Sequence, residues 1–143
     1  MTTDEDIAER LRLSIGRFTR VVRALSDTMP QTQAAALGAL DREGPQTIAR
    51  LAAGRGVKHQ GMSRTVGELE TLGRVARSQN PDDGRAFLIA LTPQGREALE
   101  LDRQARRNWI AEAIETQLNA EERRILYALP EVLDRLSSLG EQS

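Results

Sequence analysis

The sequence of 143 residues contains no cysteine and a single histidine, His59. Without cysteine there can be no disulfide framework, thiolate metal site, catalytic thiol or cysteine redox sensor. One histidine cannot by itself provide the ligand set of a transition-metal site. The chain also lacks a glycine-rich phosphate loop, a nucleophile–base pair and a recognisable pair of catalytic carboxylates. We therefore expect no metal, no cofactor and no enzymatic activity.

Long hydrophobic runs are absent as well. No apolar stretch approaches the roughly 18 residues that a membrane-spanning helix needs. Residues 1–9 are acidic and lack the basic start and apolar core of a secretory signal. We expect a cytoplasmic protein without membrane contacts. The length favours one domain, residues 1–143, with a core of its own.

The net charge is only −1, but the charges are unevenly distributed. Basic side chains concentrate between Arg50 and Arg77, where only Glu68 and Glu70 oppose them. A local basic patch in an otherwise acidic chain can bind nucleic-acid phosphates. The alternative is an ordinary solvated surface.

The first part of the chain is predicted to be helical. Apolar residues that recur at steps of three and four indicate an amphipathic helix over residues 4–27. Pro30 suits the first position of a second helix, because its fixed φ matches the first helical turn. The pair Gly44-Pro45 should end that helix.

Two short helices follow, separated by a turn of small residues. Thr47 is the expected N-cap of the first, which Gly54 and Gly56 should end. The second is expected to run from about Lys58 to Leu72, with Gly73 as its C-cap. Two helices joined in this way are typical of a helix-turn-helix. The residues expected on the inner side of the second helix are Met62, Val66 and Leu69.

A β-hairpin is predicted directly after this pair. Residues 75–77 and 86–91 have the composition of strands, and residues 80–84 (NPDDG) are dense in turn formers. A hairpin in this place is a wing, so residues 30–92 are expected to form a winged helix-turn-helix lobe. The predicted fold class is mainly α with a small β-hairpin.

Two further helices should complete the chain. Thr92 as N-cap and Pro93 at the first position begin one that runs to about Leu118. Asn119 with Glu122 resembles a capping box for the last helix. The residues expected to be buried in the long helix are Leu99, Trp109, Ala113 and Leu118.

The terminal helices, residues 4–27 and 93–140, carry apolar stripes beyond what a winged helix needs. In the last helix the stripe is spaced 4-3-4-3, and Pro130 should kink the helix or break one turn. We expect two copies to bury these stripes in a two-fold homodimer, whose paired recognition helices suit a palindromic site. The alternative is a monomer whose terminal helices pack on its own core. The residues expected at the dimer interface are Ile7, Leu11, Ile125, Leu129, Val132 and Leu136.

Three segments carry a resemblance to a known family. They are residues 57–70 with Met62-Ser63-Arg64, residues 73–85 with Asp83-Gly84-Arg85, and the exit Leu91-Thr92-Pro93-Gln94-Gly95. Together with the order of helices, they resemble the multiple antibiotic resistance regulator (MarR) family. Residues 58–61 differ from many members, so the target sequence cannot be carried over. The cysteine of the family's peroxide-sensing branch is absent, which excludes that branch.

The resemblance implies a sequence-specific regulator that binds double-stranded DNA and is a repressor released from its operator by a small aromatic or phenolic ligand. Phe18, Met29 and Trp109 could supply apolar walls for that ligand, with Arg17 or Arg20 as the counter-charge. One alternative is a constitutive DNA-binding protein without an effector. Another is a winged-helix module that binds proteins.

The recognition helix should face DNA with the side opposite its apolar residues. Gln60 can pair with adenine through two hydrogen bonds. Lys58 and the helix N-terminus suit a phosphate group, and the resemblance implies that Arg64 contacts the DNA backbone or a base. The residues expected to contact DNA are Lys58, His59, Gln60, Ser63, Arg64, Arg77 and Arg85.

In the wing, Arg85 is the best candidate for insertion into a minor groove, because narrow A/T tracts attract arginine. Asp83 would repel phosphate, so we expect it to hold the hairpin through Arg77 or Arg85, with Gly84 in the same turn.

Overall fold

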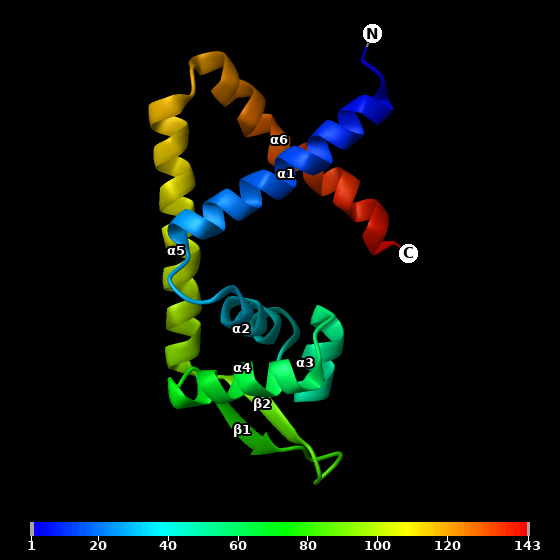
Figure 1. The fold of residues 1–143 in the computed structure, drawn as a ribbon, viewed down its shortest axis with the longest axis vertical. Helices are drawn as coiled ribbons and strands as arrows, with labels where there is room; N and C mark the ends of the chain where they lie inside the picture. Colours follow the sequence, from blue (N-terminus) through cyan, green and yellow to red (C-terminus); the bar gives the residue numbers. More distant parts are fainter. Residues whose placement is uncertain (1, 143) are drawn as a thin grey trace. The chain divides into compact units, whose positions relative to one another are not determined.

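The computed structural model describes residues 2–142 and divides into two compact units, the first ending at Arg107 and the second beginning at Asn108. This part of the chain consists of six α-helices and one two-stranded antiparallel sheet (Figure 1), which confirms the predicted fold class. Between residues 2 and 142, none of the helices has the length and apolar character required to span a bilayer. The elements are α1 Asp4–Ser26, α2 Gln31–Glu43, α3 Ile48–Arg55, α4 His59–Thr71, β1 Val75–Gln79, β2 Phe87–Leu91, α5 Pro93–Gln117 and α6 Ala120–Glu141.

All six predicted helices are present, and local capping explains most of their ends. Thr47 accepts a hydrogen bond from the main-chain N–H of Arg50 at the start of α3. Asn119 and Glu122 form the predicted capping box of α6. A second capping box, between Thr3 and Asp6 at the start of α1, was not predicted.

Three predicted boundaries were slightly wrong. Pro30 is the N-cap of α2 and not its first residue. Gly54 lies inside α3, which ends only at Arg55, because Gly56 is the residue that adopts the left-handed conformation (φ 64°) needed to turn the chain out of the helix. Strand β1 extends to Gln79, beyond the predicted end, because it pairs with all of β2.

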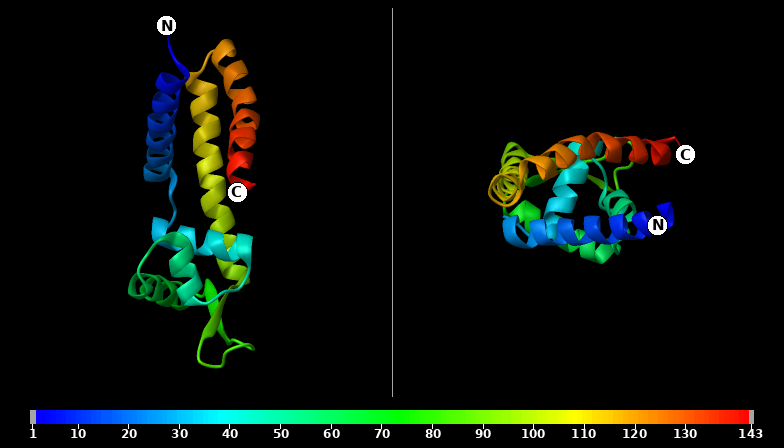
Figure 2. Two further views of the ribbon diagram at one scale, coloured as in Figure 1. Left: turned by 90° about the vertical axis from the view of Figure 1, so that its right-hand side faces the viewer. Right: turned by 90° about the horizontal axis from the view of Figure 1, so that it is seen from above.

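The core of the first unit is built by the helix-turn-helix and the hairpin together. Leu37 of α2, Leu51 of α3, Leu69 of α4 and Ile89 of β2 are fully buried. Each such side chain contributes about 1.5–3 kcal/mol through burial. Leu99 joins the same cluster from α5. Figure 2 shows the hairpin projecting beyond α2, α3 and α4, so its loop lies outside this core.

The second unit contains the end of α5 and all of α6. Leu99 is buried as predicted, but Trp109, Ala113 and Leu118 are only half-buried, which corrects that prediction. No residue from 108 to 142 is buried, so the second unit encloses no interior that could bury these side chains. The sequence predicted a kink or a broken turn at Pro130. The broken turn is wrong, because α6 is continuous through this residue, and the kink stays a prediction. Proline there removes one main-chain donor without ending the helix.

Candidate nucleic-acid interface

The two sides of α4 have opposite characters. Met62, Val66 and Leu69 are buried in the core, as predicted. On the other side, four of the residues predicted to contact DNA are exposed, and Ser63 is half-buried beside them. The exposed four are Lys58, His59, Gln60 and Arg64.

The N-terminus of α4 is open. Lys58 is the N-cap residue, and its side chain makes no capping hydrogen bond. The first main-chain N–H groups of an α-helix have no partner inside the helix and bear a partial positive charge. Gly61, in the same turn, has no Cβ, and a Cβ built there would meet no atom within 4 Å. This end of the helix therefore presents donors and free space together.

Two side chains, one amide and one carboxylate, stabilise the wing loop by accepting hydrogen bonds from main-chain N–H groups. Asp83 accepts from the main-chain N–H of Arg85 at 3.0 Å, and Asn80 accepts from that of Asp82 at 3.1 Å. Asp83 thus stabilises the hairpin as predicted, but through the main chain of Arg85 and not through an arginine side chain. Gly84 does not adopt a positive φ.

The two wing arginines differ in their surroundings. Arg77 places its Nε 2.7 Å from a carboxylate oxygen of Glu70 on α4, and its guanidinium lies 5.9 Å from the centre of the Phe87 ring. Arg77 therefore fixes β1 to the recognition helix. Arg85 is exposed, and within residues 2–142 no carboxylate lies within ion-pair distance of it. Of the two, only Arg85 is available without breaking an internal contact.

A groove of about 450 Å³ brings predicted residues from distant parts of the sequence together. His59 from the start of α4 lies on it with Arg77 and Arg85 from the hairpin, and Thr47 and Ile48 form its α3 side. Gln60, Ser63 and Arg64 are not part of its lining.

A polar chain that the sequence did not reveal lies behind the recognition helix. The buried Gln33 of α2 donates to a carboxylate oxygen of Glu68 at 3.2 Å. The other carboxylate oxygen of Glu68 lies 3.5 Å from Nε of Arg64. Arg74 donates to the side-chain oxygen of Gln33 at 3.5 Å. The only signal in the sequence is a glutamine next to the apolar residues of α2.

Thr92 and Gly95 determine how the chain passes from the wing into α5. The hydroxyl of Thr92 donates to the carbonyl of Gly73 at 2.6 Å and accepts from the N–H of Gly95 at 3.0 Å. A Cβ at Gly95 would lie 1.9 Å from the carbonyl oxygen of Arg74. Only glycine therefore lets α5 start this close to the end of the recognition helix, and this contact sets where the wing emerges.

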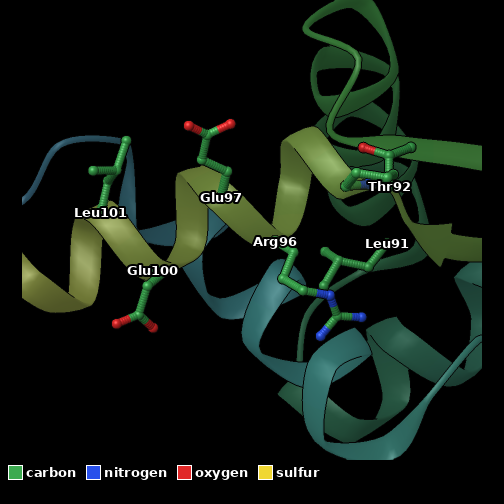
Figure 3. A pocket seen from close by; sticks show the side chains of 7 residues that line it. Leu91, Thr92, Arg96, Glu97, Glu100 and Leu101 are labelled. Carbon is green, nitrogen blue, oxygen red and sulfur yellow. The ribbon is translucent and has the colours of Figure 1, made fainter.

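A second cavity, of about 540 Å³, lies along the first turns of α5. Figure 3 shows Arg96 beside Leu91, while Glu97 and Glu100 project away from them. None of the residues expected to form the walls of an effector site lines this cavity or the groove beside the wing. Met29 is buried in the core of the first unit, and Phe18 is half-exposed on α1.

Comparisons with known proteins agree with this geometry. A family model described as MarR family matches residues 27–86, from the end of α1 to the wing loop. An HTH-type transcriptional regulator of Mycobacterium tuberculosis is 33% identical over 135 residues, which cover 93% of this chain and 94% of the relative. An HTH-type transcriptional regulator of Mycobacterium leprae is 33% identical over 128 residues, or 88% of this chain and 89% of the relative.

Solved structures share the fold. MarR of Escherichia coli in its apo form is 25% identical, with a TM-score of 0.62 over 82% of this chain and 96% of that one. A transcriptional regulator of Thermotoga maritima is similar with a TM-score of 0.78 over 94% of this chain and 99% of that one. At 20% identity the second likeness concerns the fold alone.

Proposed function

The chain belongs to the MarR family of transcription regulators, which are not enzymes, and from this premise we propose that it is a homodimeric repressor of a palindromic operator. In this proposal residues 30–92 form the DNA-binding lobe, and residues 4–27 and 93–140 form the dimerisation region. The observation that supports it best is the open, exposed N-terminal half of α4, which lies beside Arg85 of the wing, an arginine with no ion pair among residues 2–142.

In the proposed complex α4 enters the major groove with its exposed side. Gln60 reads an adenine, while Lys58 and the uncapped N–H groups of α4 bind a phosphate. Ser63 and Arg64 contact a base edge or the backbone from the next turn. The missing side chain at Gly61 lets the helix approach the base pairs closely. His59 is placed beside the wing and contacts the backbone there.

The wing supplies a second contact. Arg85 enters the adjacent minor groove, where the negative potential of a narrow A/T tract attracts a guanidinium. Arg77 acts differently from Arg85, since its contact with Glu70 must be shared with or given up to a phosphate.

Dimerisation through the terminal helices is supported by their exposed apolar side chains. Ile7 is 49% exposed on α1, and Ile125 and Leu136 are 66% and 55% exposed on α6. Large apolar surfaces of this kind mark interaction sites. A two-fold dimer presents two recognition helices and therefore requires two half-sites about one helical turn apart.

A small aromatic or phenolic anion is the proposed effector. A ligand that prefers a spacing of the recognition helices unsuited to the operator must lower the DNA affinity by linkage. Two alternatives compete with this proposal. A constitutive DNA-binding protein would bind the same operator without an effector, and a protein-interaction module would not bind DNA at all.

The test is fluorescence anisotropy with a duplex from the promoter upstream of the protein's own coding sequence. We expect the association constant to fall steeply as salt rises, because phosphate contacts release counterions. A scrambled duplex of equal length and composition should bind about 10³-fold more weakly or worse. No binding at low salt would contradict the proposal for this promoter.

The same complex distinguishes the two DNA-binding alternatives. Titration with 4-hydroxybenzoate should release the duplex, whereas cyclohexanecarboxylate, a non-aromatic anion of similar size, should not. If neither anion changes the anisotropy, the protein is constitutive towards this class of ligand and the effector proposal is wrong.

A further inference from the structure

One cavity of the first unit is lined by five arginines from four helices. It encloses about 230 Å³, and its other lining residues are small or apolar, with no carboxylate among them. Arginine carries a permanent charge, so five of them around one small space repel each other unless anions intervene. The five are Arg23 of α1, Arg42 of α2, Arg55 of α3, and Arg103 and Arg106 of α5.

Four carboxylates pair with three of these arginines and leave the other two without a close counter-charge. Arg55 pairs with Glu43 at 3.1 Å. Arg103 pairs with Asp41 at 3.0 Å, and Arg106 is shared between two aspartates of the first unit. In the part of the chain that the structure describes, neither Arg23 nor Arg42 has a carboxylate within 4.0 Å.

Arg55 lines the cavity while its guanidinium is held from behind by Glu43, whose carboxylate lies 3.1 Å from Nη2. Its Nε has no hydrogen-bond partner among residues 2–142, but this atom is closed to solvent and does not face the cavity. The anion would therefore meet the other guanidinium nitrogens of the five arginines.

We infer that this cavity binds a compact multivalent oxyanion, of the phosphate or polycarboxylate type. Planar guanidinium groups match such anions with paired, charge-assisted hydrogen bonds. The volume equals the share of roughly eight water molecules at about 30 Å³ each, which is enough for a diphosphate or a small tricarboxylate. On the α2 side the space is left open by the methyl groups of Ala34 and Ala35 and by Gly38, which has no side chain.

The site is distinct from the proposed aromatic effector site. None of the residues expected at that effector site lines this cavity, and five of its nine lining residues are arginines. The residues expected there were Phe18, Met29, Trp109, Arg17 and Arg20. A bound anion would join the last residue of α3 to α1 and α5 and so restrain the helix-turn-helix. That regulatory meaning rests on the proposed DNA-binding role, whereas the binding of the anion does not.

The test is isothermal titration calorimetry of the DNA-free protein at constant ionic strength. Pyrophosphate and citrate serve as separate probes and acetate as the monovalent control. We expect saturable binding of one anion per chain for at least one of the two multivalent probes, and the stronger one identifies the anion type. Acetate should give no saturable heat.

Three variants locate the site. Arg42→Gln breaks no ion pair within 4.0 Å and loses only a weaker attraction to Glu43. It should therefore fold normally and bind the anion about tenfold more weakly, the scale of one charged hydrogen bond. Arg50→Gln changes an exposed arginine of α3 outside the cavity and should bind like the wild type. Lys58→Gln removes a charge from the proposed DNA face and should also leave anion binding unchanged.

Two outcomes would overturn the inference. One is the absence of saturable binding by both multivalent probes. The other is a loss of affinity in Lys58→Gln or Arg50→Gln equal to that in Arg42→Gln, since the anion would then bind the DNA face or the overall charge. DNA binding by the wild type is measured separately. If the protein binds DNA but not the anions, this inference is wrong while the proposed function stands.

Discussion

Asp102 of α5 accepts two hydrogen bonds from Thr28, one from the main-chain N–H at 2.8 Å and one from the hydroxyl at 2.9 Å. Arg106, one turn further along α5, pairs with both Asp102 and Asp27. The carboxylate of Asp102 is fully buried. These contacts fix the connection between α1 and α2, on which the start of the DNA-binding lobe depends, to the long helix.

Replacement of Asp102 by asparagine should destabilise the fold. The asparagine side chain would lack the charge that Arg106 faces and could not accept at both positions, so we expect the free energy of unfolding to fall by about 1–3 kcal/mol. Urea denaturation followed by circular dichroism measures this. Glu100→Gln is the matched control, because it removes an exposed ion pair with Arg107 on the same helix and should cost less than about 1 kcal/mol. Equal losses in both variants would refute the assigned role of Asp102.

The same residue predicts a pH dependence. Burial alone raises the pKa of Asp102, but the hydrogen bonds from Thr28 and Arg106 outweigh it and hold the pKa below its usual value. A lowered pKa in the folded state stabilises the protein above the ordinary carboxyl pKa of about 4, and this stabilisation is lost as pH falls through the folded value. The wild type should therefore lose more stability than Asp102→Asn between about pH 5 and pH 2. Parallel acid profiles would contradict this.

Arg85→Ala tests the wing. The side chain of Arg85 makes no ion pair within residues 2–142, so its loss should leave the melting temperature nearly unchanged. Binding to the operator should weaken by about 1–3 kcal/mol, the scale of one good contact. Arg10→Ala, which removes an exposed arginine on α1, serves as the charge control in the same anisotropy assay. Normal operator affinity in Arg85→Ala would mean that the wing is not a DNA contact.

Glu68→Gln should strengthen DNA binding. In the proposed complex Glu68 competes with phosphate for Arg64 and repels the DNA backbone, while Gln33 holds its carboxylate from the core. Glutamine keeps a hydrogen-bonding side chain next to Gln33 and removes the charge. We expect the affinity to rise about two- to fivefold at low salt, as for one exposed charge interaction, with a smaller gain at high salt. Glu97→Gln on α5 is the control, and an equal gain there would show a general charge effect.

The sequence predicted those parts of the fold that depend on neighbouring residues. The caps at Thr47, Thr92 and Asn119 and the glycine at residue 56 act within a few positions, so their residue types alone locate the helix ends. The hairpin could also be predicted from local signals, because its turn-forming residues lie between two short strands.

The interactions that could not be predicted from the sequence join residues that lie far apart in it. Thr28 and Asp102 are separated by 74 positions, and Gln33 and Glu68 by 35. Separations of this length follow no recognisable pattern, so nothing in the sequence identifies these residues as partners. The half-burial of Trp109 was missed because an apolar residue on a helix does not reveal how many neighbours surround it. The DNA contacts of Lys58, Gln60, Ser63 and Arg64 stay predictions, although the structure leaves these side chains at least partly accessible.

The apolar stripe of α6 predicts which surface the dimer would bury. Leu136 is 55% exposed and shares the stripe with Ile125, Leu129 and Val132, and α6 contains no buried residue. In a two-fold dimer this stripe would be buried against the partner chain. We therefore expect Leu136→Glu to convert a dimer into a monomer in sedimentation velocity experiments, because a charge cannot be buried in an apolar interface without a partner.

The control for this change lies one residue further along the helix. Ser137 is exposed and points about 100° away from Leu136, as 3.6 residues per turn require. Ser137→Glu introduces the same charge outside the stripe and should remain dimeric. Because the proposed dimer binds two half-sites together, Leu136→Glu should also lose most of its operator affinity while keeping the helical content of the wild type. A wild-type chain that sediments as a monomer at micromolar concentration, or a dimeric Leu136→Glu, would contradict the assignment of α6 to the dimer interface.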